Sequence, residues 1–393
     1  MAERKDSKGR ILRRGEGQRP NGLYYFKYVD AKGKTVYAYS WTLTIHDKMP
    51  RGKRPGLCLR EKEKEIQRDL FCGIAPSKMT VFELASRYVE TRNNVRETTR
   101  RGYKTVLNFL SKSDFGRLDV SDVGTIDARE WLVDLQRNPN KSYSTIRCIR
   151  GVLRPAFRLM VDDGAIRRNP FDFELGSVLG NDSVPRVALT KKQERLFLDF
   201  VRNDAHFSRY YDAFCILFKT GMRVSELCGL TVSDVDFESG FLRIERQLQR
   251  TSGMRYYIEL PKSERGKRRF PMGESLSENV RNVIENRIVP NAEAVVDGVS
   301  GFLFLDKNQM PTVALHWEKY LKHAVQKYNR IFKEEMPHIT PHVCRHTFCT
   351  RMVRSGMSAI KLQYLMGHSD IATTYGVYTH LEPDDLVDER LEF

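Results

Sequence analysis

The chain has 393 residues, of which 40% are hydrophobic, and its 66 Lys and Arg against 50 Asp and Glu give a net charge of +16. This length predicts two or three domains, and this charge favours a polyanion such as nucleic acid over an acidic small molecule as the partner. No segment approaches the about eighteen consecutive apolar residues of a membrane span, and the N-terminus lacks a signal-peptide core, so we expect a cytoplasmic protein. The seven cysteines include no Cys-x-x-Cys pair, which argues against a disulfide framework and a zinc finger.

Most of the positive charge lies at the N-terminal end. Residues 1–60 hold fifteen Lys and Arg but five Asp and Glu, a net charge of +10. Aromatic and β-branched runs at 23–29 and 35–41 flank a polar stretch that contains Gly33, a pattern that predicts a β-hairpin. A helix is predicted over 59–71. A small basic sheet on one helix suits a DNA groove, and the alternative is a solvated hairpin without a ligand.

A helical bundle is predicted after a polar linker at 75–78. Thr80 and Glu83 have the spacing of a capping box, which opens a helix. The helical patterns, with no convincing strand among them, cover residues 80–91, 96–112, 127–136 and 142–163. Pro155 should bend the last of these helices near Gly151, because proline lacks the N–H of a helical hydrogen bond and its ring clashes with the preceding turn.

The same predicted helix carries a row of arginines on one face. They recur at steps of three and four residues: Arg147, Arg150, Arg154 and Arg158. Such a row matches the regular spacing of backbone phosphates. The four are therefore DNA-binding candidates, although a solvated helix face has the same pattern.

The third region begins after a connection at 169–185, and Thr190 and Gln193 form another capping box there. It is mostly helical, with strand-like runs at 241–245, 256–260 and 268–271. The predicted fold class is therefore multidomain and mainly α. It comprises a small N-terminal domain of a β-sheet plus a helix, a helical bundle, and a mainly helical last domain with a small antiparallel sheet. The predicted boundaries are 1–75, 76–180 and 185–393.

Side chains that suit chemistry gather near the C-terminal end. Thr340 and Pro341 are an N-cap residue and an N1 proline, so a helix should begin just ahead of His342. His342 and Arg345 then lie one turn apart near the positive end of the helix, where a phosphate is favoured. His342 and His346 also have the i, i+4 spacing of a zinc pair. No glutamate follows His342 and no third ligand is evident, so no metal site is predicted.

Further residues stand in sequence contexts that suit chemistry, and each has an ordinary structural reading as well. Arg223 follows a glycine break and could simply pair with Glu226 three residues later. Lys262 lies in a polar turn between two predicted strands, where lysines are usually solvated. His368 follows a glycine at a tight turn, and Tyr378 lies ten residues later.

Taken together, these motifs resemble those of the tyrosine recombinase family. The matching stretches are Thr-Gly-Met-Arg-Val-Ser-Glu-Leu at 220–227, Thr-Pro-His-Val-Cys-Arg-His-Thr-Phe at 340–348 and Leu-Met-Gly-His-Ser-Asp-Ile-Ala-Thr-Thr at 365–374. Farther upstream, Gly-Leu-Tyr-Tyr-Phe-Lys-Tyr-Val-Asp at 22–30 and Asn-Pro-Phe-Asp-Phe-Glu-Leu at 169–175 are similar to integrases of conjugative transposons, a branch related to phage lambda integrase. The resemblance covers nearly the whole chain.

The resemblance implies a transesterification of DNA that needs no metal and no cofactor. Tyr378 would attack the scissile phosphate and form a 3′-phosphotyrosyl link, which frees a 5′-hydroxyl. Arg223 and Arg345 would hold the non-bridging oxygens through charge-assisted hydrogen bonds, and His368 would add another donor. Strands could then be exchanged without ATP, because the link conserves the energy of the phosphodiester.

Supporting roles also follow from the resemblance. Lys262 would protonate the leaving 5′-oxygen, and His342 would assist proton transfer from the tyrosine. Glu226 would orient Arg223 or His342.

Two of these assignments have a competitor nearby. Tyr375 lies on the same segment as Tyr378, and the family's spacing after His368 together with the following Thr-His pair favours Tyr378. Lys267 competes with Lys262 because the length of this turn varies in the family, and Lys262 is favoured.

For the working complex, the resemblance implies double-stranded DNA that is bound at accessory arm-type sites by 1–75 and clamped at the core site by 76–180 and 185–393. It further implies four protomers on two DNA segments in the bacterial cytoplasm, with an excisionase or a host DNA-bending protein as accessory partner. The expected activity is integration and excision of a mobile element. The alternatives are a type IB topoisomerase, against which the basic hairpin domain argues, and a DNA-binding regulator with vestigial catalytic residues.

Overall fold

The computed structural model describes residues 4–29, 33–71, 79–137, 141–182, 187–251, 253–261, 266–368 and 370–378, with the backbone alone at positions 69, 71, 373, 377 and 378. The chain forms two compact units, Met1–Val184 and Pro185–Phe393. None of the helices in the described ranges combines the length and the apolar character that a membrane span requires.

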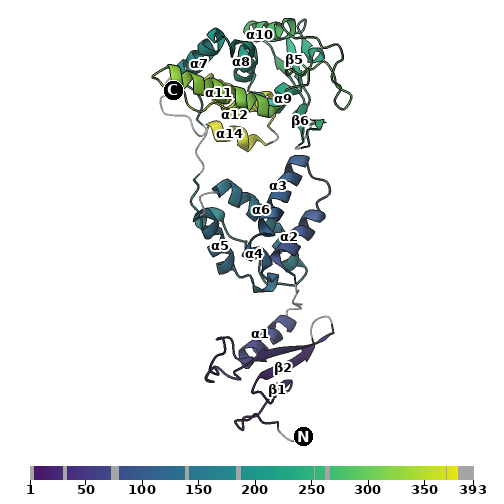
Figure 1. Ribbon diagram of the computed structural model, residues 1–393, viewed down its shortest axis with the longest axis vertical. Coiled ribbons are helices and arrows are strands. Elements are labelled where there is room, and N and C mark those ends of the chain that lie inside the picture. Colours follow the sequence, from purple (N-terminus) through teal and green to yellow (C-terminus); the bar gives the residue numbers. More distant parts are fainter. Residues whose placement is uncertain are drawn as a thin grey trace, which may run out of the picture. The chain divides into compact units, whose positions relative to one another are not determined.

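The N-terminal part of the first unit is a three-stranded antiparallel sheet with one helix (Figure 1). Its elements are β1 (Glu16–Gln18), β2 (Tyr24–Val29), β3 (Thr35–Ser40) and α1 (Leu59–Phe71). The alternation of β2 buries Tyr24 and Phe26 against Leu43 and Leu59, which form a small core. The predicted hairpin and helix are confirmed, and part of the hairpin turn, 30–32, lies outside the described residues.

The strand β1 was not predicted, because its sequence Glu-Gly-Gln has neither β-branched nor aromatic residues. Its pairing with β2 makes it a strand. Glu16 is fully buried there, and its carboxylate accepts a hydrogen bond from Nε of Arg60 on α1 at 3.0 Å. Pairing with β2 and a buried ion pair between the sheet and α1 therefore hold β1 in place, and neither is visible in its sequence.

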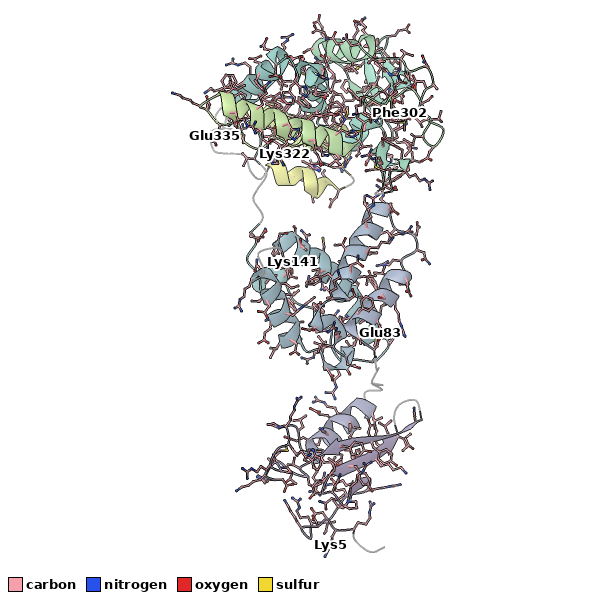
Figure 2. All side chains as sticks on the ribbon, in the orientation of Figure 1. Lys5, Glu83, Lys141, Phe302, Lys322 and Glu335 are labelled. Atoms are coloured by element: carbon pink, nitrogen blue, oxygen red, sulfur yellow. The ribbon has the colours of Figure 1, made fainter. Side chains whose placement is uncertain are left out.

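The second part of this unit is a helical bundle. Its elements are α2 (Val81–Glu90), α3 (Glu97–Leu110), α4 (Asp114–Arg117), η1 (Val120–Asp122), α5 (Thr125–Arg137), α6 (Tyr143–Asp162) and η2 (Leu175–Ser177). The four predicted helices and the capping box are confirmed. The side chain of Glu83, labelled in Figure 2, accepts a hydrogen bond from the Thr80 amide at 2.9 Å, and the Glu83 amide donates to Oγ1 of Thr80 at 3.2 Å. The bundle has its own hydrophobic core, separate from that of the sheet.

The helix α6 runs as one element through Pro155. Ile146, Ile149, Leu153 and Phe157 are buried along it, so the predicted apolar face packs into the bundle core. Burial of this face over twenty residues outweighs the single backbone hydrogen bond that Pro155 removes.

The second unit is mainly helical. Its helices are α7 (Lys191–Asn203), η3 (Ser208–Tyr210), α8 (Tyr211–Thr220), α9 (Val224–Cys228), η4 (Val232–Asp234), α10 (Glu274–Glu285), α11 (Ala314–Ile331), α12 (Pro341–Arg354), α13 (Ala359–Met366) and α14 (Ile371–Tyr378). The helix α12 contacts α8, α11, α13 and α14, and Figure 1 shows it beside α11 and α14. Phe302, labelled in Figure 2, is fully buried in the core, whereas Lys322 on α11 is exposed.

The strands of this unit form two small antiparallel sheets. One has the order β4-β5-β8, with β4 (Val235–Asp236), β5 (Phe241–Ile244) and β8 (Arg268–Pro271), and the other pairs β6 (Gln247–Arg250) with β7 (Tyr256–Glu259). The chain runs out through β5 and β6, turns at 251–255, and returns through β7 and β8.

The segment that contains Lys262 lies between β7 and β8, which pair with β6 and β5, respectively, and not with each other in the described part of the chain. The turn that joins β6 and β7 is at 251–255, where Met254 has a positive φ of 64°. Lys262 itself lies outside the described residues.

Candidate active site

Arg345 lies in the interior of the second unit, on the first turns of α12. The helix begins as predicted: Thr340 is the N-cap, its hydroxyl accepts from the Val343 amide at 3.2 Å, and Pro341 is the first helical residue. Nη1 of Arg345 donates to the carbonyl oxygen of Gly221 at 2.8 Å, and Nη2 donates to that of Met366 at 2.6 Å. The guanidinium therefore joins α12 to the ends of α8 and α13.

Burial, helped by the nearby Arg223, lowers the pKa of Arg345 to about 9. The side chain is still protonated at neutral pH, so a positive charge is held inside the protein. Such a charge is costly unless an anion or well-placed acceptors compensate it. Two backbone carbonyls compensate it here, and both are neutral.

Glu226 is the only carboxylate in the described hydrogen-bond network around Arg345, and it is 2% exposed. The sequence left open whether it merely pairs with Arg223, and the structure shows that pair: Nη1 of Arg223 donates to Oε1 at 2.8 Å, and the Arg223 amide donates to Oε2 at 2.9 Å. The other terminal nitrogen of Arg223 donates to the Gly367 carbonyl at 3.1 Å. Arg223 is thus oriented on one side by Glu226 and on the other by the turn before His368.

Arg268 belongs to the same network and was not predicted. Its side chain is fully buried, and Nη2 donates to Oε2 of Glu226 at 2.8 Å. It also donates to the carbonyls of Leu365 at 2.7 Å and Gly266 at 3.2 Å. The only sequence signal was its place in a predicted strand, where alternation would bury every second side chain, and Arg-Arg-Phe-Pro does not say which arginine that is.

The charges of this cluster do not balance. Burial alone would raise the pKa of Glu226, but the guanidinium groups of Arg268, Arg223 and Arg345 outweigh it and lower the pKa to about 2. One carboxylate therefore faces three guanidinium groups. An excess of positive charge on neighbouring, largely buried guanidinium groups favours the binding of an anion such as a phosphate.

His368 lies at the edge of this cluster, after the left-handed residue Gly367. Nδ1 of its ring is 2.9 Å from Oγ1 of Thr374 on α14. Burial, with Arg345 and Arg223 close by, lowers the pKa of the imidazole to about 4. The ring is therefore neutral at physiological pH, and it carries a single N–H donor.

The remaining predicted residues are placed less fully. His342 is exposed on α12, one turn before Arg345. Tyr378 is the last residue of α14, and its side chain lies outside the described part of the chain; Tyr375 on the same helix is 51% exposed. Lys267 is exposed just before β8. Within the described ranges no group of three or more His, Cys, Asp or Glu has the arrangement of a metal site.

The arginine row of α6 has intramolecular contacts in the first unit. Arg150 donates to the carbonyls of Phe171, at 3.0 Å, and of Phe173. Arg154 pairs with Asp172 at 2.5 Å and Arg158 with Asp162 at 3.0 Å, whereas Arg147 is exposed. Arg150 therefore helps to hold the 169–175 segment on the bundle, and the DNA contacts of all four stay a prediction.

Gly221 has the backbone geometry on which the cluster depends. It ends α8 with φ 59°, and an added Cβ would lie 2.5 Å from the Phe348 ring. We expect Gly221→Ala to lower the free energy of unfolding of this unit by about 2 kcal/mol, because the left-handed conformation and the ring contact both penalise a side chain. Urea unfolding would measure it in a chain that keeps Trp317 and has phenylalanine at the other two tryptophans, so that the signal reports this unit.

The matched control for that measurement is Gly273→Ala. Gly273 has φ −71° and open space around its Cβ position, so its loss of stability should stay below about 0.5 kcal/mol. Equal losses in the two variants would contradict the special role of Gly221.

Comparison with known proteins shows to which protein family the chain belongs. Residues 188–384 match the phage integrase family, and residues 1–70 match the DNA-binding domain of Tn916 integrase. The chain belongs to the phage integrase family. As a member of it, the chain is a DNA strand-exchange enzyme of the tyrosine recombinase type, and the resemblance in its motifs is confirmed.

Several relatives match along nearly the whole integrase chain. The transposase from transposon Tn1545 of Streptococcus agalactiae serotype V and that from transposon Tn916 of Enterococcus faecalis are each 40% identical over 390 residues, which cover 98% of this chain and 96% of the relative. A solved Tn1549 transposon integrase in complex with a circular intermediate DNA is 38% identical, covers 79% of this chain and 98% of that chain, and has a TM-score of 0.75. A lambda integrase tetramer bound to a Holliday junction shares the fold at 17% identity and a TM-score of 0.54, over 92% of this chain and 94% of that chain.

Proposed function

We propose that this integrase cuts and rejoins DNA at specific sites through a 3′-phosphotyrosyl intermediate, and so integrates and excises a mobile element such as a conjugative transposon. The observation that carries the proposal is the cluster of Arg223, Glu226, Arg345 and His368. Segments more than 120 residues apart in sequence meet there, through the carbonyls of Gly221 and Gly367. The relatives of nearly equal length are transposases of Tn1545 and Tn916.

The proposed chemistry combines this cluster with the roles predicted for Tyr378, His342 and Lys262. The Tyr378 oxygen forms a bond to the scissile phosphorus while the bond from phosphorus to the 5′-oxygen breaks. The phenol loses its proton with the help of His342, and the leaving oxygen gains one from Lys262. Arg223 and Arg345 donate to the non-bridging oxygens, where negative charge grows in the transition state. In the structure, both terminal nitrogens of Arg345 and Nη2 of Arg223 donate to backbone carbonyl oxygens.

Glu226 holds this site together without touching the phosphate. Its carboxylate orients Arg223 through two hydrogen bonds and keeps Arg268 in place behind it. A fixed guanidinium needs no reorganisation when the phosphate arrives, and preorganisation of this kind is the largest part of electrostatic catalysis.

The layout along the chain supports the same function. Residues 1–75 are proposed to bind arm-type sites, since 1–70 match a transposon integrase DNA-binding domain and carry most of the net charge. Residues 76–180, with the arginine row of α6, and residues 185–393 are proposed to clamp the core site. The Tn1549 integrase was solved on DNA with a fragment similar to 79% of this chain. Four protomers and an excisionase or host DNA-bending partner complete the proposed complex.

The proposal is tested with a duplex that carries the junction sequence of the element and a nick close to the cleavage position. The wild-type chain should form a covalent protein–DNA adduct that survives denaturant and that peptide mapping assigns to Tyr378. Tyr378→Phe should form none, and Tyr375→Phe should form it at close to the wild-type level. An adduct in Tyr378→Phe, or one that maps to Tyr375, would overturn the assignment.

Two additions to the same assay separate the alternatives. Cleavage should persist in EDTA, which a metal-dependent site around His342 and His346 would not allow. Plasmid without the recombination sites should not be relaxed at the rate at which junction DNA is cleaved, whereas a topoisomerase would relax it. Binding without any adduct would indicate a DNA-binding regulator.

A further inference from the structure

Thr374 is buried in the last described helix, next to the active-site histidine. The residue is fully inaccessible, and Oγ1 lies 2.9 Å from Nδ1 of His368. The helix that carries it, α14, packs against α12 and α13, and Tyr378 stands four residues after Thr374 on it (Figure 1). One short helix therefore carries both the proposed nucleophile and the partner of the histidine ring.

We infer that Thr374 is a positioning residue, which donates its hydroxyl proton to Nδ1 of His368 and thereby keeps the imidazole proton on Nε2, where it can be donated to the scissile phosphate. This inference rests on the proposed function for the role of the phosphate. The hydrogen bond and the tautomer do not depend on that function.

The direction of the hydrogen bond follows from the number of partners. Within the described part of the chain, Oγ1 of Thr374 makes this one hydrogen bond. If Nδ1 were the donor, the buried hydroxyl proton would have no acceptor among the described residues, and leaving a buried donor unsatisfied is costly. If the hydroxyl is the donor, both atoms are satisfied. Nδ1 is then an acceptor, and the proton of the neutral ring must be on Nε2.

The ring has few other restraints. The main chain of His368 is held by Gln363, whose carbonyl accepts from the His368 amide at 3.2 Å and whose side chain donates to the His368 carbonyl at 3.1 Å. These contacts hold the backbone and involve neither nitrogen of the ring. Among the described residues the Thr374 hydroxyl is the hydrogen-bond partner of the ring, and Nε2 has none, so Nε2 is left for a ligand.

The positive surroundings make the tautomer decisive. Burial and the nearby Arg345 and Arg223 lower the pKa of His368 to about 4, so the ring is neutral at the pH of the reaction. A charged imidazolium would donate from both nitrogens in any case, but a neutral ring donates from one. If the proton were on Nδ1, Nε2 would be an acceptor, and its lone pair would repel the phosphate oxygens. The hydroxyl of Thr374 decides between these states.

The test compares Thr374→Val, which keeps the shape and removes the hydroxyl, with Thr374→Ser, which keeps the donor. The single-turnover rate of adduct formation on the nicked duplex should fall about 10- to 100-fold in Thr374→Val, which is less than the roughly 100- to 1000-fold loss on removing a whole transition-state donor. Thr374→Ser should restore most of the rate. The Kd for the duplex should change less than about twofold in both, because the tautomer matters most in the transition state.

A matched control is Thr312→Val in the same unit. Thr312 is also buried, and its hydroxyl donates to the Phe304 carbonyl at 3.3 Å and accepts from Trp317 at 3.1 Å. Its replacement should lower stability at least as much as Thr374→Val and leave the cleavage rate within about threefold. A rate loss equal to that of Thr374→Val would show that lost stability, and not the tautomer, is the cause, and would overturn the inference.

A double-variant cycle shows whether Thr374 acts through His368. In a His368→Ala background, Thr374→Val should cost no further rate, because the ring that it orients is gone. An equal loss in both backgrounds would overturn the inference. So would a wild-type rate in Thr374→Val alone.

Nitrogen NMR of the full chain labelled with ¹⁵N-histidine gives a readout that needs no cleavage. With the His368 signals identified by their loss in His368→Ala, the wild-type ring should show a protonated Nε2 and an unprotonated Nδ1 at pH 7. Thr374→Val should show a mixture of both tautomers. A proton on Nδ1, or an imidazolium in the complex with duplex DNA, would overturn the inference. Failure of the proposed function would instead appear as a wild-type chain that forms no adduct while the Nε2–H tautomer is observed.

Discussion

Arg345→Lys should lower the single-turnover rate of adduct formation by roughly 1000-fold, the range in which a positioned guanidinium acts on a transferring phosphoryl group. The two terminal nitrogens of Arg345 point to different acceptors, the Gly221 and Met366 carbonyls, at 2.8 and 2.6 Å. A planar fork of this kind can move both donors to two phosphate oxygens, whereas a lysine ammonium is a single point on a shorter reach. The variant keeps a basic group and removes the planar fork.

Binding and cleavage should separate in that experiment. The Kd for the nicked duplex should rise by less than about tenfold, since most phosphate contacts of a DNA-binding protein lie outside the active site. Arg351→Lys is the matched control on the same helix: Arg351 pairs with Glu194 at 2.8 Å and donates to the Phe218 carbonyl at 2.7 Å, away from the cluster. If Arg351→Lys slowed cleavage as much as Arg345→Lys, the clamp role of Arg345 would be wrong.

The place of Arg345 shows what the sequence could predict. An N-cap threonine and an N1 proline determine where α12 begins, so the position of Arg345 on the first turns was predictable from local rules. Its acceptors were not, because Gly221 is 124 residues away and Met366 belongs to another helix. The motif resemblance indicated which residues belong to one site. Only the fold shows that the carbonyls of Gly221 and Gly367, and that of Met366 beside Gly367, accept hydrogen bonds from Arg345 and Arg223.

Arg268 shows the limit of pattern reading more sharply. An arginine in a short strand of sequence Arg-Arg-Phe-Pro reads as solvated, yet its side chain is fully buried, while Arg269 beside it is exposed. The difference is decided by the register of β8 on β5, where Ile244 pairs with Arg268. Arg150 is a second case, since it lies on the helix face predicted to contact phosphates and also binds a neighbouring segment of the protein. Long-range pairing decides both, and a single sequence does not encode it locally.

The pairing of β7 and β8 has the same origin. The strand-like runs predicted there are found as strands, but the runs alone did not indicate their partners. Their partners are β6 and β5, because the hairpin turn lies earlier, at 251–255. The strand β6 has the sequence Gln-Leu-Gln-Arg, which carries little strand propensity, so the sequence pattern did not predict this partner of β7.

The largest expected effect on stability is that of Arg268→Met. Methionine fills much of the volume of the side chain but leaves Glu226, which is 2% exposed, without the fully buried guanidinium that donates to it at 2.8 Å. Removal of one partner from a buried ion pair costs about 3 to 5 kcal/mol, and the lower end of this range is expected here because Arg223 still pairs with Glu226. Urea unfolding reported by Trp317 should show this loss. Arg268→Met combined with Glu226→Gln should lose less than the sum of the single losses, and strict additivity would contradict a direct pair.

Acid titration of the wild-type chain gives an independent check on the same pair. The pKa of Glu226 is about 2 in the folded protein against 4.5 as the ordinary value, because the guanidinium groups outweigh its burial. A depressed carboxyl pKa adds stability that is fully present above pH 4.5 and is lost as the pH falls toward 2, by about 3 kcal/mol in total.

His368 titrates at a higher pH than Glu226. Its pKa is lowered from 6.5 to about 4, mainly by burial, so the folded state loses stability as the pH falls from 6.5 toward 4. Glu226→Gln should therefore flatten the stability curve below pH 4.5 and leave the slope between pH 6.5 and 4.5 in place, whereas His368→Gln should do the reverse. A Glu226→Gln curve parallel to wild type below pH 4.5 would mean that Arg268 and Arg223 do not hold the carboxylate ionised.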